Sequence, residues 1–231
     1  MGTLLLIRHG QASYGEVDYD RLSTRGEQQA RALGKFLADQ RFDQLFVGPL
    51  VRQQRTAALA CELAGTLPEA KTLVELAEYP AFDLLQHFMP KLVETDPKFA
   101  ALTQTPTREL ANEAFHTILG RWARDEWEVE GVERVTAFAD RVRRGLDQIV
   151  RDVRSGARIA AITSAGPIGV AVGLTFGASE HHMIRTSIVI RNASITELRF
   201  RSRDFDWHPD RVSLIAFNSI HHLPPELHTE Y

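Results

Sequence analysis

Two short stretches of the sequence carry side chains suited to holding a phosphoryl group. The tripeptide RHG at 8–10 follows directly on the apolar run TLLLI. The stretch GPLVRQQRTA at 48–57 places Arg52 and Arg55 three residues apart, which brings both guanidinium groups to one face of a helix. A guanidinium matches the geometry of phosphate oxygens, and an imidazole is a nucleophile that forms covalent intermediates. Together the two stretches predict a site for a phosphorylated ligand.

Each signal also has an ordinary structural explanation. A single histidine such as His9 is more often structural or exposed than catalytic, and two arginines on a helix often form a solvated face. Arg8 favours the functional interpretation, because a cation at the end of a buried strand needs an anionic partner. Arg52 favours it as well, since free N–H groups and the helix dipole attract an anion to the first turn of a helix.

Alternating strands and helices must position these residues. Apolar runs predict strands at 3–7, 45–47, 72–76, 157–163, 187–191, 194–200 and 212–217. Helices are expected near 28–39, 49–64, 135–154 and 166–177, the first of them opened by the capping-box spacing of Thr24 and Glu27. This alternation predicts an α/β fold with three layers, α/β/α, around a mostly parallel central sheet. Ligands gather at the carboxyl ends of such strands, where RHG lies.

The region from about 80 to 130 differs from the rest of the chain. It carries four prolines between short amphipathic pieces, at positions 80, 90, 97 and 106. This pattern predicts a helical insert that caps the pocket within a single domain spanning residues 1–231.

Composition limits the classes of function. The net charge is −3, so no basic field favours nucleic acid. No apolar stretch approaches the ~18 residues of a membrane span, and the first residues do not resemble a signal peptide. Cys61 is the single cysteine, so no internal disulfide forms, which fits a reducing compartment. A cytoplasmic protein without nucleic-acid or membrane partners is therefore expected.

The motifs and their order resemble the histidine phosphatase superfamily, the phosphoglycerate-mutase-like group. RHG ends the first strand, GPLVRQQRTA is similar to the family pattern SPLxRAxxTA, and LAE at 76–78 is similar to LxE. LSTRGEQQA at 22–30 resembles the start of the family's first helix, and RNASITEL at 191–198 resembles a late strand. The resemblance runs from residue 4 to about residue 200.

The resemblance implies a mechanism and a set of roles. His9 would be the nucleophile and form a phosphohistidine, while Arg8 and Arg52 would bind the phosphate oxygens. Glu78 would protonate the leaving oxygen and then assist water, a role that needs a raised pKa. The arginines supply the positive charge, so no metal or other cofactor is implied. The partner would be a small phosphorylated substrate or inorganic phosphate.

One departure from the family pattern stands out. The family's second histidine ends a later strand as SHGGxIR or THGGxIR, whereas this chain reads AITSAGPIG at 161–169. Ser164 takes the histidine position. A serine donates one hydrogen bond but cannot be cationic. A phosphate pocket that includes Ser164 is still expected, with slower catalysis.

Other side chains are candidates to compensate for the lost histidine. Arg55 stands where the family usually has glutamine and would return a positive charge to the pocket. Gln11 and Ser13 follow RHG and are further candidates to bind phosphate. His181 and His182 follow the helix after Ser164, although exposed loop histidines are the favoured interpretation of that pair.

Three functions remain open on this evidence. The first is a phosphomonoester hydrolase acting through a phosphohistidine. The second is a catalytically impaired member of the family that binds phosphorylated ligands. The third is a phosphoglycerate mutase, which is less favoured because the basic residues of the insert, Lys91, Lys98 and Arg108, are widely separated. A homodimer formed through an edge strand is also open.

Overall fold

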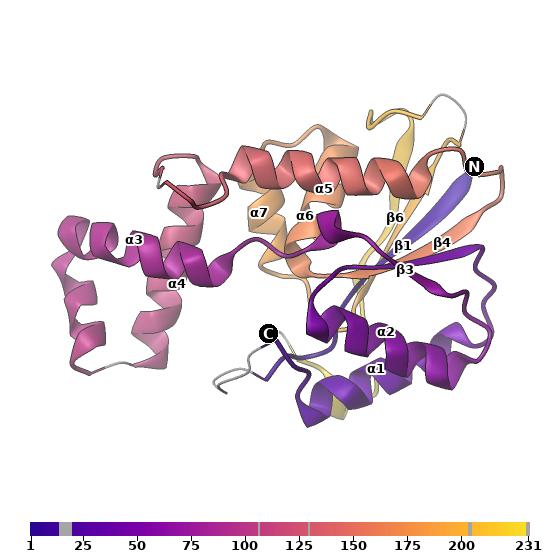
Figure 1. The fold of residues 1–231 in the computed structure, drawn as a ribbon, viewed down its shortest axis with the longest axis horizontal. Coiled ribbons are helices and arrows are strands. Elements are labelled where there is room, and N and C mark those ends of the chain that lie inside the picture. Colours follow the sequence, from indigo (N-terminus) through magenta and orange to yellow (C-terminus); the bar gives the residue numbers. More distant parts are fainter. Residues whose placement is uncertain (14–19, 106, 129, 203–204, 230–231) are drawn as a thin grey trace.

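The computed structural model describes residues 1–13, 20–105, 107–128, 130–202 and 205–229. In these ranges six strands form one sheet, in the order β3-β2-β4-β1-β5-β6 (Figure 1). The strands are β1 Gly2–Arg8, β2 Gln44–Val47, β3 Ala70–Thr72, β4 Arg158–Thr163, β5 Ile195–Phe200 and β6 Val212–Ser219. Neighbours among β1 to β4 pair in parallel, whereas β5 and β6 are antiparallel additions. The predicted α/β fold with a mostly parallel sheet is confirmed.

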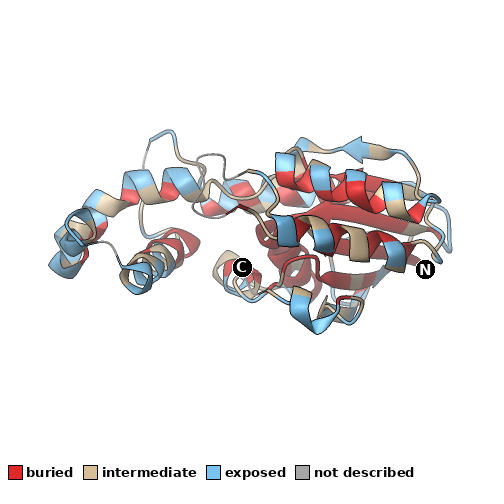
Figure 2. Cartoon of the chain, turned by 90° about the horizontal axis from the view of Figure 1, so that it is seen from below, coloured by how far each residue is buried: buried red, intermediate tan, exposed pale blue. Residues whose placement is uncertain are grey.

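Alternation along β1 explains the three layers. Leu5 and Ile7 belong to the core that α1 (Thr24–Leu37) and α2 (Val51–Ala64) cover. Leu4 and Leu6 belong to the core on the opposite face. That face is covered by α5 (Val135–Val150), α6 (Ala165–Phe176) and α7 (Glu180–Ser187) (Figure 1). Because side chains of a strand point alternately to opposite faces, an apolar run such as TLLLI fits a strand buried on both sides. Figure 2 shows buried strands of the sheet lying between helices.

Helix ends differ from the predicted ones where a local cap decides. Helix α1 starts at residue 24 rather than near 28, because the Ser23 hydroxyl caps it by accepting from the N–H of Gly26 at 3.0 Å. The predicted cap at Thr24 is therefore wrong by one residue. Helix α5 stops at Val150 rather than 154, since Arg151 is already extended. Residues 14–19 of the loop after RHG lie outside the described ranges.

Two predicted strands are shorter or absent. Of the predicted run 72–76, only Thr72 lies in a strand, as the last residue of β3. Val74–Leu76 instead form a 3-10 helix, η1, whose last carbonyl accepts from the Thr163 hydroxyl at 2.8 Å. The segment 187–191 ends α7 and turns instead of forming a strand. Asn218 holds this turn, because its side chain bonds both Val189 O and the N–H of residue 191, each at 2.7 Å.

Residues 81–123 project from one end of the sheet (Figure 1). They form α3 (Ala81–Thr95), the 3-10 helix η2 (Pro97–Thr103) and α4 (Arg108–Ala123). Phe88, Phe99 and Trp122 are almost fully buried there and form the local core. A further 3-10 helix, η3 (Pro225–Leu227), lies near the C-terminus. No helix within the described part of the chain is long and apolar enough to cross a membrane.

Candidate active site

Three of the predicted motifs meet at the carboxyl edge of the sheet. Strands β1 and β4 are parallel neighbours, with Arg8 opposite Thr163, and the N–H of His9 donates to Thr163 O at 2.9 Å. Ser164 follows directly on β4. Strand β2 lies on the other side of β4 and leads into α2, which carries Arg52. The topology of the sheet, rather than closeness in sequence, brings these side chains together.

His9 has the properties of a neutral nucleophile. The residue is 3% exposed, and its Nδ1 lies 2.7 Å from the carbonyl oxygen of Gly10. Since a carbonyl only accepts, Nδ1 carries the proton and Nε2 keeps its lone pair. The pKa of His9 is held well below its ordinary value, mainly by burial and further by the charges of Arg52 and Arg8. The imidazole is therefore neutral at neutral pH.

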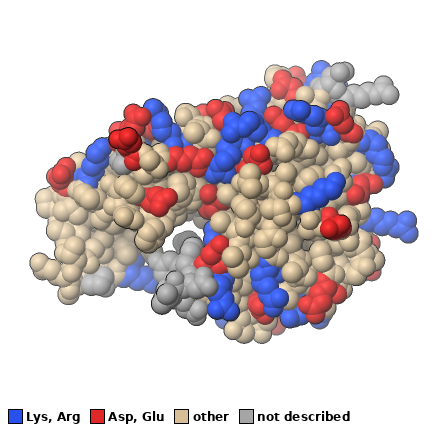
Figure 3. All heavy atoms as spheres, in the orientation of Figure 1, with Lys and Arg blue, Asp and Glu red and all other residues tan. Residues whose placement is uncertain are grey.

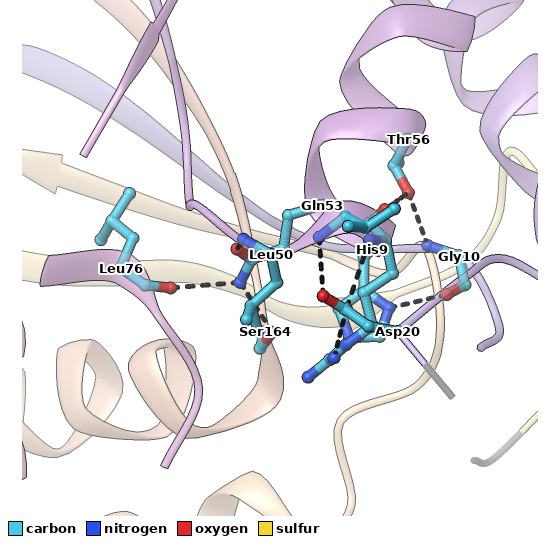
Figure 4. Close-up of polar contacts among 10 residues, drawn as sticks. His9, Gly10, Asp20, Leu50, Gln53, Thr56, Leu76 and Ser164 are labelled. Atoms are coloured by element: carbon cyan, nitrogen blue, oxygen red, sulfur yellow. Dashed lines mark hydrogen bonds and ion pairs between the residues drawn. The ribbon is translucent and has the colours of Figure 1, made fainter. Parts of the chain in front are cut away.

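Arg52 contacts Nε2 of His9 and an acidic residue at the same time. Its Nε donates to His9 Nε2 at 3.0 Å, and its Nη1 lies 2.7 Å from Asp20 Oδ1. The Asp20 carboxylate also accepts from the N–H groups of Val51 at 2.9 Å and Arg52 at 3.4 Å (Figure 4 labels Asp20). An internal carboxylate thus occupies the helix terminus and the guanidinium that are expected to bind phosphate.

Thr56 fixes the backbone of the first motif to α2. The N–H of Gly10 donates to Thr56 Oγ1 at 3.1 Å, and that hydroxyl donates to Arg52 O at 2.7 Å. A Cβ at position 10 would lie 2.4 Å from Gly26 O, so the close passage of α1 requires a glycine there. The glycine of the RHG motif therefore has a structural cause.

Glu78 follows η1 by two residues and lies at the N-terminus of α6. Its Oε1 and Oε2 accept from the N–H of Gly166 at 3.0 and 3.2 Å, and Oε1 also accepts from the N–H of Tyr79 at 3.1 Å. Burial raises the pKa of Glu78, while Arg52, the backbone bonds and Arg8 partly offset that rise. The charges of Arg52 and Arg8 therefore lower the pKa of Glu78 as they lower the pKa of His9. A raised pKa keeps a proton available for a leaving oxygen.

The remaining arginines have different surroundings. Arg8 is partly buried and donates through Nη1 to the carbonyl of Ile190. Arg55 is half-exposed and pairs with Glu27 of α1 at 2.8 Å. To bind phosphate, Arg55 would have to leave Glu27.

Gln11 and Ser13 lie on the loop that follows His9. The Gln11 N–H donates to Gln29 Oε1 at 2.8 Å, and its side-chain oxygen accepts from the Ser23 hydroxyl at 3.0 Å. Ser13 is buried, and its N–H donates to Arg21 O at 2.8 Å. The described contacts of both residues hold the loop against its own return segment and α1.

Ser164 is fully buried, and its hydroxyl oxygen accepts from Gln53 Nε2 at 2.8 Å (Figure 4). His181 and His182 lie in the first turn of α7 rather than in a loop, and His182 Nδ1 lies 2.8 Å from the Ser179 hydroxyl. The loop interpretation of the two histidines was therefore wrong. In the part of the chain that the structure describes, no three His, Cys, Asp or Glu side chains cluster to hold a metal ion.

Sequence reasoning missed Asp20, Gln53 and Thr56. Asp20 lies in a polar loop with no signal beyond its charge. Gln53 and Thr56 lie in the predicted helix at 49–64, where the two arginines give the stronger signal for an anion. The Gln53 signal was available, since the family pattern SPLxRAxxTA has alanine at that position.

The family model for the histidine phosphatase superfamily (branch 1) matches residues 4–105 and 81–209 of this chain. The chain belongs to the histidine phosphatase superfamily. The resemblance seen in the motifs is thereby confirmed. No curated protein matches the sequence.

Solved structures share the fold of this chain along almost its whole length. YhfR from Bacillus stearothermophilus has a TM-score of 0.69 at 16% identity, with 96% of this chain and 99% of that chain covered. A mycobacterial glucosyl-3-phosphoglycerate phosphatase in complex with inorganic phosphate has a TM-score of 0.67 at 19% identity, with 96% of this chain and 99% of that chain covered. A mutant phosphoserine phosphatase from Entamoeba histolytica, in complex with phosphoserine, has a TM-score of 0.62 at 20% identity, with 97% of this chain and 100% of that chain covered.

Proposed function

We propose that this protein is a phosphomonoester hydrolase that acts through a phosphohistidine at His9 on a small phosphorylated substrate. One observation carries the proposal: a buried, neutral imidazole presents its Nε2 lone pair beside the Arg52 guanidinium at 3.0 Å. That arrangement combines a nucleophile with a charge that stabilises phosphate oxygens. Phosphatases with the same fold support it.

In the first step, Arg52 turns from His9 Nε2 to the oxygens of the entering phosphate. The Nε2 lone pair then forms a bond to phosphorus while the bond from phosphorus to the leaving oxygen breaks. The proton of Glu78 passes to that oxygen. Arg8 and Arg52 offset the charge on the phosphoryl oxygens.

In the second step, the Glu78 carboxylate takes a proton from water. The water oxygen bonds to phosphorus, and the phosphorus–nitrogen bond breaks with its electron pair returning to Nε2. Phosphate leaves, and both His9 and Glu78 regain their starting protonation states. This cycle uses one group as acid and then as base, which suits a carboxyl whose pKa is raised.

We also propose that the projecting helical segment, about 80–130, caps this site. Figure 3 shows a hollow between that segment and the rest of the molecule, with charged side chains on the side of the sheet. Ser164 would complete the phosphate pocket. It would be joined by Arg55, Gln11 or Ser13 once that residue leaves its present contacts. A cytoplasmic location is part of the proposal. So is a homodimer through edge strand β6, where Ile215 and Phe217 are exposed.

A second candidate is a family member that binds phosphorylated ligands with little turnover. Ser164 favours it, because a buried neutral hydroxyl stands where the family pattern has a histidine. The loss of one donor to developing charge costs about 10²–10³ in turnover.

Hydrolysis of p-nitrophenyl phosphate by the wild type and by His9→Ala tests the two candidates. The proposal expects phosphate release by the wild type and a loss of more than about 100-fold in His9→Ala, at an unchanged melting temperature. Binding of inorganic phosphate without hydrolysis would establish the second candidate. Isomerisation of a phosphoglycerate would instead establish a mutase.

A further inference from the structure

Gln53 is a fully buried amide whose orientation is fixed by three partners. Its Oε1 accepts from the N–H of Leu50 at 3.0 Å, and its Nε2 donates to Leu76 O at 3.1 Å and to Ser164 Oγ at 2.8 Å (Figure 4). The reversed amide would place two acceptors, Oε1 and Leu76 O, against each other. The nitrogen therefore faces Ser164, and the serine oxygen acts as the acceptor.

This bond determines what the Ser164 hydroxyl can do. A hydroxyl has one proton to donate, and a lone pair of this oxygen is occupied by the Gln53 amide. The proton must point away from Gln53. Ser164 lies between two parts of the site, because the preceding carbonyl, Thr163 O, accepts from the N–H of His9, and the N–H of Gly166 donates to Glu78. The residues on either side of Ser164 thus contact His9 and Glu78.

Three departures from the family patterns form one packed unit. The pattern SPLxRAxxTA has serine and alanine where this chain has Gly48 and Gln53, and the strand pattern has histidine where it has Ser164. Compared with the family pattern, the side chain at 53 is larger and the side chain at 164 is smaller. A Cβ at position 48 would lie 2.2 Å from Gln53 Oε1, so glycine at 48 makes room for the amide.

We propose that Gln53 is a positioning residue that replaces the bulk of the family's second histidine and orients the Ser164 hydroxyl as a neutral donor to the phosphoryl group. The proposal rests on the proposed phosphohydrolase function. Gln53 itself does not touch the substrate, since all its described hydrogen-bonding groups are engaged. Its effect on the reaction passes through Ser164.

A double-mutant cycle on p-nitrophenyl phosphate hydrolysis tests this coupling. Gln53→Met keeps the length of the side chain without its amide, and Ser164→Ala removes the hydroxyl. We expect each single variant to lower kcat by about tenfold or more. In the Ser164→Ala background, Gln53→Met should lower kcat by less than about twofold, because the hydroxyl that Gln53 positions is absent.

Gln54→Ala is the matched control. Gln54 lies one residue further along α2 and donates to Gly48 O and to Thr72 Oγ1, at 2.7 and 3.1 Å, away from Ser164. Its effect on kcat should be additive with that of Ser164→Ala. The coupling would be overturned if the loss of kcat in the double variant equalled the product of the losses in Gln53→Met and Ser164→Ala. The proposed function would stay intact in that case, provided that activity still requires His9. If hydrolysis does not require His9, both fall.

An exchange variant gives a second test. Ser164→His alone meets the Gln53 amide, so we expect no gain in kcat. Ser164→His combined with Gln53→Ala returns these two positions to the residues of the family pattern and should be at least tenfold faster than Gln53→Ala alone. A gain from Ser164→His without the change at 53 would show that Gln53 does not fill the histidine's place. Melting temperatures identify any variant that does not fold, and the Gln53→Met cycle then decides.

Discussion

Gly166→Ala should disable Glu78 without changing any group that reacts. A Cβ at position 166 would lie 2.1 Å from Glu78 Oε1, and ordinary contact begins at 3.4 Å. The carboxyl oxygen must therefore move by about 1.3 Å, the difference between these two distances. Tyr79 and Phe138 stand 2.8 and 2.9 Å from the same Cβ and limit the adjustment of the backbone. A misplacement of about 1 Å in a reacting group costs about 100-fold in rate.

The assay compares two substrates with different needs for an acid. We expect Gly166→Ala to lower kcat about 100-fold for an alkyl phosphate and much less for p-nitrophenyl phosphate, whose leaving group departs without a proton. Gly120→Ala is the control, because its new Cβ would meet nothing closer than the flexible end of Arg124 at 3.6 Å. Equal losses on both substrates, or no loss at all, would refute the role of Glu78 as the acid.

A shorter acid gives an internal check of the same reasoning. Glu78→Asp withdraws the carboxyl from the position of the new Cβ. Gly166→Ala should therefore cost less than about twofold in a Glu78→Asp background, since the collision it causes is absent. An undiminished loss in that background would mean that Gly166→Ala acts through the backbone of α6.

Two further expectations concern the charges around the site and the tail. Asp20→Asn should tighten the binding of inorganic phosphate roughly threefold in calorimetry, because it removes the partly exposed ion pair that engages Arg52. Glu62→Gln, which removes a carboxylate of α2 that pairs with Arg31 instead, should leave phosphate binding unchanged. Weaker binding by Asp20→Asn would show that Asp20 only orients Arg52. Burial and the charge of His221 lower the pKa of His222 from 6.5 to about 4, so its contribution to the free energy of unfolding is present above pH 6.5 and falls by up to about 3 kcal/mol as pH drops toward 4. His222→Gln should flatten that pH dependence in chemical denaturation, and an unchanged slope would contradict the shift.

The sequence predicts well those parts of the site that the sheet itself places. His9, Arg52 and Ser164 each follow a strand of the parallel set, so their meeting depends only on strand order and direction. Glu78 needed the family pattern, because the segment before it forms η1 rather than the predicted strand. The carbonyl of Leu76, bound by a side chain of β4, determines that turn, and such a contact leaves no periodicity in the sequence.

Contacts between side chains of distant segments account for the rest. Asp20 acquires its importance only when its loop meets α2, and Gln53 lies about 100° around the helix from Arg52, on the side that faces β4. Helix α7 is not predicted because its residues, EHHMIRTS, are mostly polar, and Met183 and Ile184 are its only buried apolar residues. Each of these features depends on tertiary packing that a single chain pattern does not encode.

Trapping of the covalent intermediate tests the central claim most directly. Glu78→Gln should slow hydrolysis of the phosphoenzyme, so a p-nitrophenyl phosphate reaction quenched in alkali should leave phosphate on the protein. Peptide mapping by mass spectrometry then locates it. The account predicts phosphate on His9, a burst of p-nitrophenol equal to the amount of enzyme, and neither signal in the His9→Ala variant. Turnover without any labelled intermediate, or phosphate attached to another residue such as Ser164, would contradict it.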